Sequence, residues 1–229
     1  MILSMHQPNF IPWLGYFDKI KKSDVFVILD NVQYPRGKSV ANRNKIKIAQ
    51  DSKEIVVPIS RPKGYEGKVT YRGVEFGDLK WYKKALKTIQ MNYSRAPFFD
   101  YYYTKLESLF QMDNFCEMNI AFIKFAMDEL KIDTPVYLLS DSGNVNYFKN
   151  DLIIYLCNTN GADVYLSGKG AQKYNDEEKL NAHGIQLKYL SFEHPVYPQL
   201  HGEFISHLSV IDLLFNCGDE SYKYLNSKS

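Results

Sequence analysis

Residues 2–30 read ILSMHQPNFIPWLGYFDKIKKSDVFVILD, and their pattern predicts the core of the protein. It opens with a short apolar run over 2–5, which has the length of a buried strand. Two prolines then interrupt regular structure, and residues 15–22 show apolar side chains at helical spacing, with lysines at the end. The apolar run over 25–29 predicts a second buried strand. Strand, loop, helix and strand in this order make a βαβ unit, so the two strands are expected to be parallel.

The rest of the chain extends this pattern. Apolar residues recur every three or four positions in three segments of the middle third, which predicts amphipathic helices over 79–93, 97–111 and 119–131. The last third returns to short strands and helices, with a final helix over 206–217 closed by Gly218. The sequence therefore predicts an α/β protein with a parallel-sheet, Rossmann-like core. We expect one domain over 1–229, with a helical insert over 78–132.

Composition excludes several functions. The chain has 229 residues, and 28 Lys plus Arg against 26 Asp plus Glu leave a formal charge of +2. A nucleic-acid binder must neutralise many phosphates and usually has a large excess of positive charge, which this chain lacks. The 18 tyrosines suit contacts with polar, planar ligands, and they suit a half-buried surface equally well. No cluster of His, Asp or Glu has the spacing of metal ligands, so no metal site is expected.

The expected location of the protein is the cytoplasm. The three cysteines are scattered singly, as is typical of buried thiols in a reducing compartment. The first residues do not resemble a signal peptide. The longest apolar run is far shorter than the roughly 20 residues of a membrane span.

Polar side chains follow the first predicted strand, where the chain approaches the helix. His6, Gln7 and Asn9 lie just past the carboxyl end of that strand. Ligands of open parallel sheets bind at this edge, and a helix N-terminus favours anions. Because such groups are costly to bury without partners, we interpret them as ligand-binding residues. The alternative is a proline-braced loop whose polar groups bond to the backbone.

A second polar group follows the second predicted strand. Asp30 ends that strand and can orient His6, as a carboxylate orients an imidazole in acid–base sites, or it can simply cap a loop. Gln33 follows three residues later. Arg43 and Asn44 can clamp a phosphate or carboxylate through the guanidinium fork, or they can be ordinary surface residues.

A third polar group follows the short strand predicted over 164–167. Ser167, Gly168 and Lys169 expose a hydroxyl, backbone N–H groups and an ammonium, which can cradle an anion. The spacing is not that of a P-loop. His194 comes after a further predicted strand, again near a carboxyl end.

Five motifs along the chain resemble the WbqC-like protein family. In order they are HQPNFIPWLGYFDKI, DNVQYPRGKSVANRNKIK, YLSGKGAQKY, HPVYPQ and LSVIDLLFNCG. The resemblance spans nearly the whole chain. Members of that family are usually found with genes for O-antigen and other surface-polysaccharide biosynthesis. The resemblance implies transfer of an acyl or aminoacyl group, such as glycyl, onto the amino group of a nucleotide-linked amino sugar.

The first two motifs and the YLSGKGAQ segment also resemble HIGH-motif nucleotidyltransferases such as pantothenate synthetase, which implies a nucleotidyltransferase-like (HUP) core. That enzyme joins a carboxylate to an amine through an acyl-adenylate. Trp13 and Tyr16 stand where the HIGH motif has two histidines that stabilise charge on the transferring phosphate. Two sources of the activated acyl group therefore stay open. Either ATP is used directly, or a thioester of a carrier protein or coenzyme A is the donor.

Under this hypothesis His6 acts as the general base for the sugar amine, and Asp30 orients it. The other candidate residues are expected to bind substrate, and they are Gln7, Asn9, Gln33, Arg43, Asn44, Ser167, Gly168, Lys169, Tyr174, His194, Tyr197 and Gln199. The expected partners are a nucleotide-linked amino sugar and an acyl carrier protein, without nucleic acid or a membrane span. Two alternative functions are an ATP-dependent amide ligase and a non-catalytic module that binds sugar nucleotides.

Overall fold

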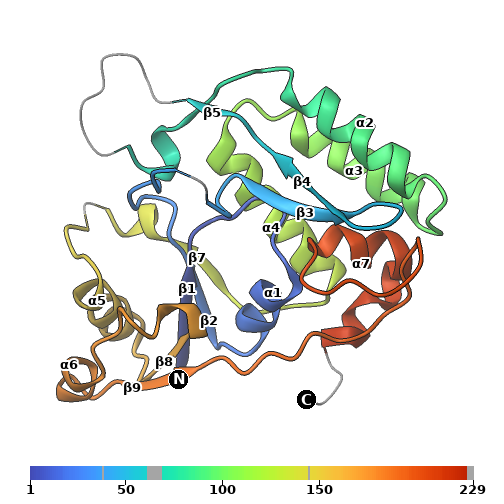
Figure 1. Ribbon diagram of the computed structural model, residues 1–229. Helices are drawn as coiled ribbons and strands as arrows, with labels where there is room; N and C mark the ends of the chain where they lie inside the picture. Colours follow the sequence, from blue (N-terminus) through green and yellow to red (C-terminus); the bar gives the residue numbers. More distant parts are fainter. Residues whose placement is uncertain (38, 61–68, 144, 226–229) are drawn as a thin grey trace. The chain divides into compact units, whose positions relative to one another are not determined.

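A parallel sheet is the centre of the α/β architecture. The computed structural model describes residues 1–37, 39–60, 69–143 and 145–225. In this part of the chain one sheet has five strands in the order β7-β2-β1-β8-β9, and every pair is parallel (Figure 1). The strands are β1 (Ile2–His6), β2 (Val25–Ile28), β7 (Val136–Leu138), β8 (Val164–Ser167) and β9 (Gln186–Tyr189). The predicted fold class, α/β with a Rossmann-like core, is confirmed.

Helices and turns connect these strands. They are α1 (Leu14–Lys21), η2 (Leu139–Ser142), α5 (Asn150–Asn160), η3 (Lys169–Ala171) and α6 (Glu177–Ala182). The βαβ unit predicted over 2–30 is present, because Leu3 pairs with Val25 and His6 with Ile28 in parallel register. The local pattern of apolar runs was therefore sufficient to predict this pairing.

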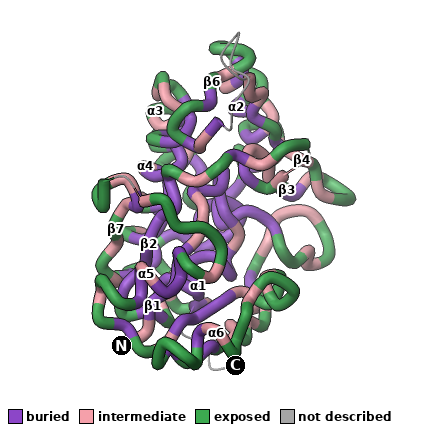
Figure 2. Tube along the Cα trace, turned by 90° about the vertical axis from the view of Figure 1, so that its left-hand side faces the viewer, coloured by how far each residue is buried: buried purple, intermediate pink, exposed green. Residues whose placement is uncertain are grey.

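Both central strands are buried, as strands inside a parallel sheet must be. All four residues of β2 are buried, and so are the three central residues of β1 (Figure 2). Ser4 is the polar residue among these three, and its hydroxyl accepts a hydrogen bond of 2.6 Å from Ser23. The apolar runs of the sequence therefore correspond to strands with no solvent-facing side.

A second group of elements contains the three helices of the middle third. These three are α2 (Trp81–Tyr93), α3 (Phe99–Phe110) and α4 (Phe115–Glu129). The same group also contains the later helix α7 (Val210–Cys217) and the turns η1 (Tyr71–Gly73) and η4 (Gly218–Leu225). Two antiparallel strand pairs accompany them, β3 (Arg43–Lys47) with β4 (Ser52–Val56), and β5 (Ile59–Ser60) with β6 (Glu75–Phe76). Their packing is aromatic, since Phe215 of α7 stacks on Tyr93 of α2 with ring centroids 4.9 Å apart.

The chain divides into two compact units that are discontinuous in sequence. The first contains residues 1–7, 15–30 and 132–193, and the second contains residues 8–14, 31–131 and 194–229. Helices α2, α3 and α4 belong to the second unit, together with the β3–β4 hairpin and α7. The prediction of one domain over 1–229 with an insert over 78–132 stays a prediction.

The last long helix starts later than predicted. We expected it to begin at residue 206, but α7 begins at Val210. His207 has a φ of 60°, which is incompatible with a right-handed helix. Ser209 then caps the helix by accepting a bond of 3.4 Å from the Ile211 N–H. Gly218 ends the helix, as expected, with a φ of 55°.

None of the helices in the described ranges combines the length and the apolar character that crossing a membrane requires.

Candidate functional site

The carboxyl edge of the parallel sheet brings two predicted polar groups to neighbouring strands. From β1 the sheet continues to β2 and β7 on one side and to β8 and β9 on the other, so its connections reverse direction between β1 and β8. Ile2 lies opposite Val164 in this pair, which is parallel. His6 and Gln7 at the end of β1 therefore share an edge with Ser167 at the end of β8. In open α/β sheets, ligands bind at this switch point.

His6 is half-buried, and its ring orientation is fixed locally. Nδ1 lies 3.1 Å from the Gln7 carbonyl oxygen, which also accepts a bond of 3.1 Å from the Tyr16 hydroxyl. Because a carbonyl only accepts, we assign the proton of the neutral ring to Nδ1, and Nε2 keeps its lone pair. The Tyr16 ring stands edge-on to the imidazole, with centroids 5.0 Å apart. Tyr16 therefore positions His6.

The surroundings keep this imidazole unprotonated. Burial, together with the smaller effect of the positive charge of Lys19, lowers the pKa of His6 to about 3. Lys19 is itself buried, donates a bond of 2.7 Å to the Met5 carbonyl, and has a pKa that burial lowers to about 8. Lys19 was not among the residues predicted for the site, because a lysine near a helix end is typical of the solvent-facing side of a helix.

The low pKa of His6 predicts a pH-dependent stability. The unfolded chain protonates His6 near pH 6.5, but the folded chain does so only near pH 3. Between these values the unfolded state binds more protons, so stability falls as the pH falls. We expect His6 to remove about 2 kcal/mol of stability between pH 7 and pH 5. Urea unfolding followed by circular dichroism should show this loss reduced in His6→Asn. An equal loss of stability in the wild-type protein and in His6→Asn would show that His6 does not cause the pH dependence.

Asp30 serves the turn that follows β7. Its carboxylate is fully buried and accepts hydrogen bonds of 2.9 Å from the Ser140 N–H and 2.6 Å from the Ser140 hydroxyl. These bonds fix η2 to the end of β2, which is the loop-capping role that sequence analysis left open. Orientation of His6 by Asp30 stays a prediction.

The segment after β8 combines a bonded hydroxyl with an exposed ammonium. Ser167 is fully buried, and its hydroxyl accepts a bond of 2.9 Å from the side-chain amide of Asn175. The same amide donates to the Tyr189 hydroxyl at 3.3 Å. Gly168 is half-buried and Lys169 is exposed. The side chain of Lys169 is therefore the group of this loop that solvent and ligands can reach.

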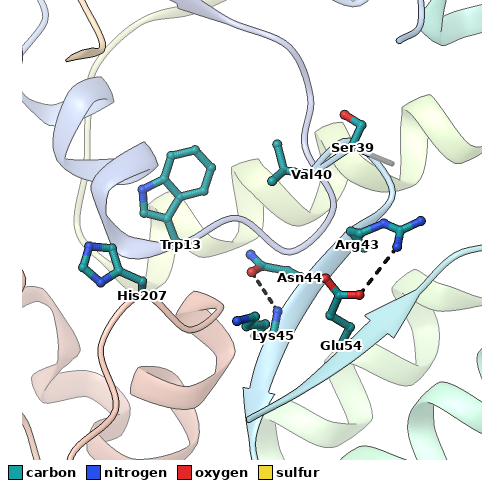
Figure 3. Close-up of a pocket in the computed structure, with 8 residues that line it drawn as sticks. All are labelled: Trp13, Ser39, Val40, Arg43, Asn44, Lys45, Glu54 and His207. Carbon is teal, nitrogen blue, oxygen red and sulfur yellow. Dashed lines mark hydrogen bonds and ion pairs between the residues drawn. The ribbon is translucent and has the colours of Figure 1, made fainter. Parts of the chain in front are cut away.

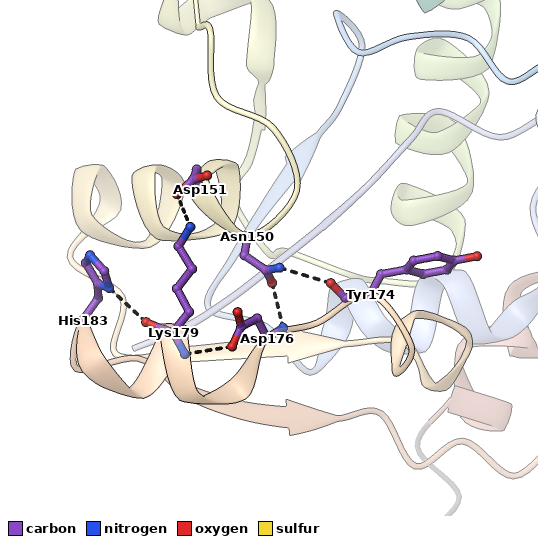
Figure 4. Close-up of polar contacts among 6 residues, drawn as sticks. All are labelled: Asn150, Asp151, Tyr174, Asp176, Lys179 and His183. Carbon is purple, nitrogen blue, oxygen red and sulfur yellow. Dashed lines mark hydrogen bonds and ion pairs between the residues drawn. The ribbon is translucent and has the colours of Figure 1, made fainter.

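Tyr174 presents an open aromatic ring. Its side chain is 69% exposed, while its carbonyl accepts a bond of 3.1 Å from Asn150. The Asn150 side chain also accepts a bond of 3.0 Å from the Asp176 N–H, and Asp176 caps α6. Figure 4 shows the ring pointing away from these contacts. The backbone at Tyr174 is thus held in place while the ring is available to a ligand.

The second unit contains a cavity of about 420 Å³ (Figure 3). Its lining residues are Trp13, Ser39, Val40, Arg43, Asn44, Lys45, Glu54 and His207. Two of these, Arg43 and Asn44, were predicted to bind substrate. Sequence analysis did not assign Trp13, Lys45, Glu54 or His207 to a site.

Arg43 and Asn44 differ in what they can offer a ligand. Nη1 of Arg43 lies 3.5 Å from a Glu54 carboxylate oxygen, and its Nε is buried with no hydrogen-bond partner. The Asn44 side chain donates to the Ile11 carbonyl at 2.8 Å and accepts from the Lys45 N–H at 2.8 Å. The side chain of Asn44 therefore links two backbone segments, whereas Arg43 has an N–H donor, Nε, without a hydrogen-bond partner.

The remaining candidates of the second unit have different surroundings. Gln33 is exposed and forms an isolated antiparallel bridge with Thr70. Asn9 is 2% exposed, and its side-chain nitrogen has no hydrogen-bond partner. Gln199 donates a bond of 2.9 Å to the Ile205 carbonyl and accepts one of 2.9 Å from the Ile205 N–H. Gln199 therefore holds its own loop closed.

His194 and Tyr197 are close to one another, with ring centroids 6.0 Å apart. The ring of His194 also lies 5.2 Å from that of His207, and burial lowers the pKa of His194. Tyr197 is buried, and burial together with the Asp212 carboxylate raises the pKa of Tyr197. Both residues thus belong to a packed aromatic cluster.

A buried polar network lies beside this cluster and was missed from the sequence. The Tyr93 hydroxyl donates to Asp212 at 2.6 Å and accepts from the Lys47 N–H at 2.8 Å. The Lys47 ammonium donates to Gln199 at 3.0 Å. One signal was available, because a single Asp within the apolar run LSVIDLLFNC indicates a buried carboxylate that needs partners.

These features define a class of protein. Numbered along the chain within the sheet, the five strands lie in the order 3-2-1-4-5, with polar residues at the switch point between β1 and β8. This arrangement defines an α/β protein with a Rossmann-like core, a class of fold in which ligands bind at the carboxyl edge of the sheet. The model of the WbqC-like protein family matches residues 7–224, and the chain belongs to that family. Membership suggests a role in surface-polysaccharide biosynthesis.

One relative matches nearly the whole chain. The sequence is 31% identical over 228 residues to the uncharacterized protein Rv1507c of Mycobacterium tuberculosis, and the match covers 96% of this chain and 95% of that protein. No solved structure matches the chain.

Proposed function

We propose that this protein transfers an acyl or aminoacyl group, such as glycyl, onto the amino group of a nucleotide-linked amino sugar during O-antigen or other surface-polysaccharide biosynthesis. The observation that carries the proposal is the imidazole of His6. It lies at the end of β1 beside the switch point, is held through Nδ1, and has a pKa of about 3. At this ligand-binding edge an unprotonated Nε2 is available to accept a proton from the attacking amine.

The reaction balances with this one residue. The sugar amine attacks the acyl carbonyl carbon of a thioester donor, and a C–N bond forms. His6 Nε2 takes the proton that the nitrogen loses. The C–S bond then breaks, and the imidazolium returns the proton to the departing thiolate. A pKa of about 3 makes His6 a weak base, so it acts after bond formation has made the nitrogen acidic, and correct positioning supplies most of the rate.

Other residues of the first unit would bind the substrates. The Lys169 ammonium and the Gly168 N–H would bind the phosphate groups of the nucleotide. The exposed ring of Tyr174 suits stacking on a base. Gln7 would hold His6 in place. Candidate substrate-binding residues of the second unit are Asn9, Gln33, Arg43, Asn44, His194, Tyr197 and Gln199, and an acyl carrier protein is the proposed donor partner.

The test is an assay of the purified full chain by mass spectrometry. A panel of nucleotide-linked amino sugars is incubated with glycyl and acetyl thioesters, or with glycine and ATP. We expect one sugar nucleotide to gain the mass of the acyl group from a thioester without ATP. Product that forms only with ATP and releases pyrophosphate would replace the proposal by a ligase. Tight binding of a sugar nucleotide with no mass change under any condition would indicate a binding module.

A further inference from the structure

The cavity of the second unit has one cationic side. Arg43 and Lys45 are alternate residues of β3, so their side chains leave the strand on the same face. Glu54 of β4 lies directly opposite Lys45 in the hairpin register, and its carboxylate is 3.5 Å from Arg43. Arg43 and Glu54 therefore form an ion pair at this end of the cavity, and Lys45 is an exposed cation of the same lining. Arg43 lines the cavity, and its guanidinium can donate to an anion there, while its Nε is buried without a hydrogen-bond partner.

The opposite side of the cavity is aromatic. In Figure 3, Trp13 and His207 lie on one side and Arg43 and Glu54 on the other. Trp13 forms an antiparallel bridge with Ser209, and the Val210 N–H donates to the Pro12 carbonyl at 2.9 Å. The indole is therefore carried by a backbone segment that is fixed to the start of α7.

We propose that this cavity binds a planar ring that bears an anionic group, with the ring against Trp13 and the anion on Arg43 and Lys45. The volume of about 420 Å³ is in the range of small-molecule sites. A guanidinium binds phosphate or carboxylate through two parallel hydrogen bonds, and an indole offers a flat apolar face. Nucleoside monophosphates combine both features at a suitable size and serve as probes.

The proposal concerns binding alone. It requires neither His6 nor an acyl donor, so its failure and the failure of the proposed transfer are distinguishable. The proposal assigns Trp13 to contact with the planar ring. At the same position the HIGH motif has a histidine that stabilises phosphate.

Isothermal titration of the full chain with each of the four nucleoside 5′-monophosphates tests the proposal. We expect at least one to bind, and we expect its parent nucleoside and inorganic phosphate each to bind at least tenfold more weakly. Arg43→Gln and Trp13→Leu should each weaken that binding at least tenfold. The matched control is Lys53→Gln, since Lys53 is an exposed residue of β4 adjacent to Glu54 and therefore on the other face of the hairpin. It should change the Kd less than twofold.

Three results would overturn the proposal. They are the absence of binding by all four probes, equal binding of inorganic phosphate or of the nucleoside, and equal weakening by Lys53→Gln. Thermal unfolding of each variant shows whether the fold is retained. If Trp13→Leu unfolds, Trp13→Phe retains a smaller ring and should weaken binding by a smaller factor than Arg43→Gln.

Discussion

Replacement of His6 by asparagine is expected to slow the proposed acyl transfer by a factor of about 10²–10⁴. The asparagine amide can still donate a hydrogen bond to the Gln7 carbonyl, but it offers no basic nitrogen in place of Nε2. Substrate binding should change little, because the residues proposed to bind the nucleotide are others. Product formation by mass spectrometry gives the rate, and calorimetric titration with the sugar nucleotide gives the Kd.

Two further variants separate chemistry from fold. His183→Asn alters an exposed histidine at the end of α6, where Nδ1 lies 2.9 Å from the Lys179 carbonyl, and should retain the wild-type rate. Tyr16→Phe keeps the ring beside His6 but removes the hydroxyl that bonds to Gln7. As a positioning residue it should lower kcat by a smaller factor than His6→Asn and leave KM unchanged. A wild-type rate in His6→Asn would remove His6 from the mechanism.

Replacement of Phe215 by alanine is expected to destabilise the second unit by about 3–5 kcal/mol. Phe215 is fully buried and stacks on Tyr93 and Phe99, with centroids 4.9 and 5.6 Å away. It also meets the edge of Tyr102 at 6.4 Å. Alanine would leave a cavity where α2, α3 and α7 converge, and the three ring contacts would be lost together. Such a loss is a large part of the total stability of an ordinary domain.

Tryptophan fluorescence during urea unfolding measures this effect. The chain has 2 Trp, Trp13 and Trp81, and both belong to the second unit, so their emission reports on that unit. The matched control is Met91→Ala, which removes a large apolar side chain of α2 that is 73% exposed. It should change the free energy of unfolding by less than about 0.5 kcal/mol. A loss below about 1 kcal/mol in Phe215→Ala would contradict the packing role.

The sheet was predictable because its signals are local. In residues 2–30, two short apolar runs predict two buried strands of a βαβ unit. The prolines and Gly15 between these runs indicate the loop and the start of the helix. The same kind of pattern gave the helices α2, α3 and α4 within a few residues of their observed bounds. The predicted start of α7 was wrong, because no sequence pattern indicates the left-handed backbone of His207.

The sites were predictable only in part. Arg43 was singled out because cations near amides suggest an anion site. Trp13 and His207, which lie nearly 200 positions apart, meet at the same cavity only through the pairing of Trp13 with Ser209. Lys19 was missed for a similar reason, because its burial depends on how α1 packs rather than on its neighbours in the chain.

The β1–β8 pairing has a consequence for how the protein is made. Ile2 lies opposite Val164, so the two paired residues are 162 positions apart in the sequence. While the chain is being synthesised, β1 can meet β2 early, but its other edge stays open until β8 has left the ribosome. Open strand edges recruit other chains, and distant pairings form slowly. A nascent chain halted before residue 164 therefore exposes the open edge of β1, and that edge is closed only when β8 pairs with it.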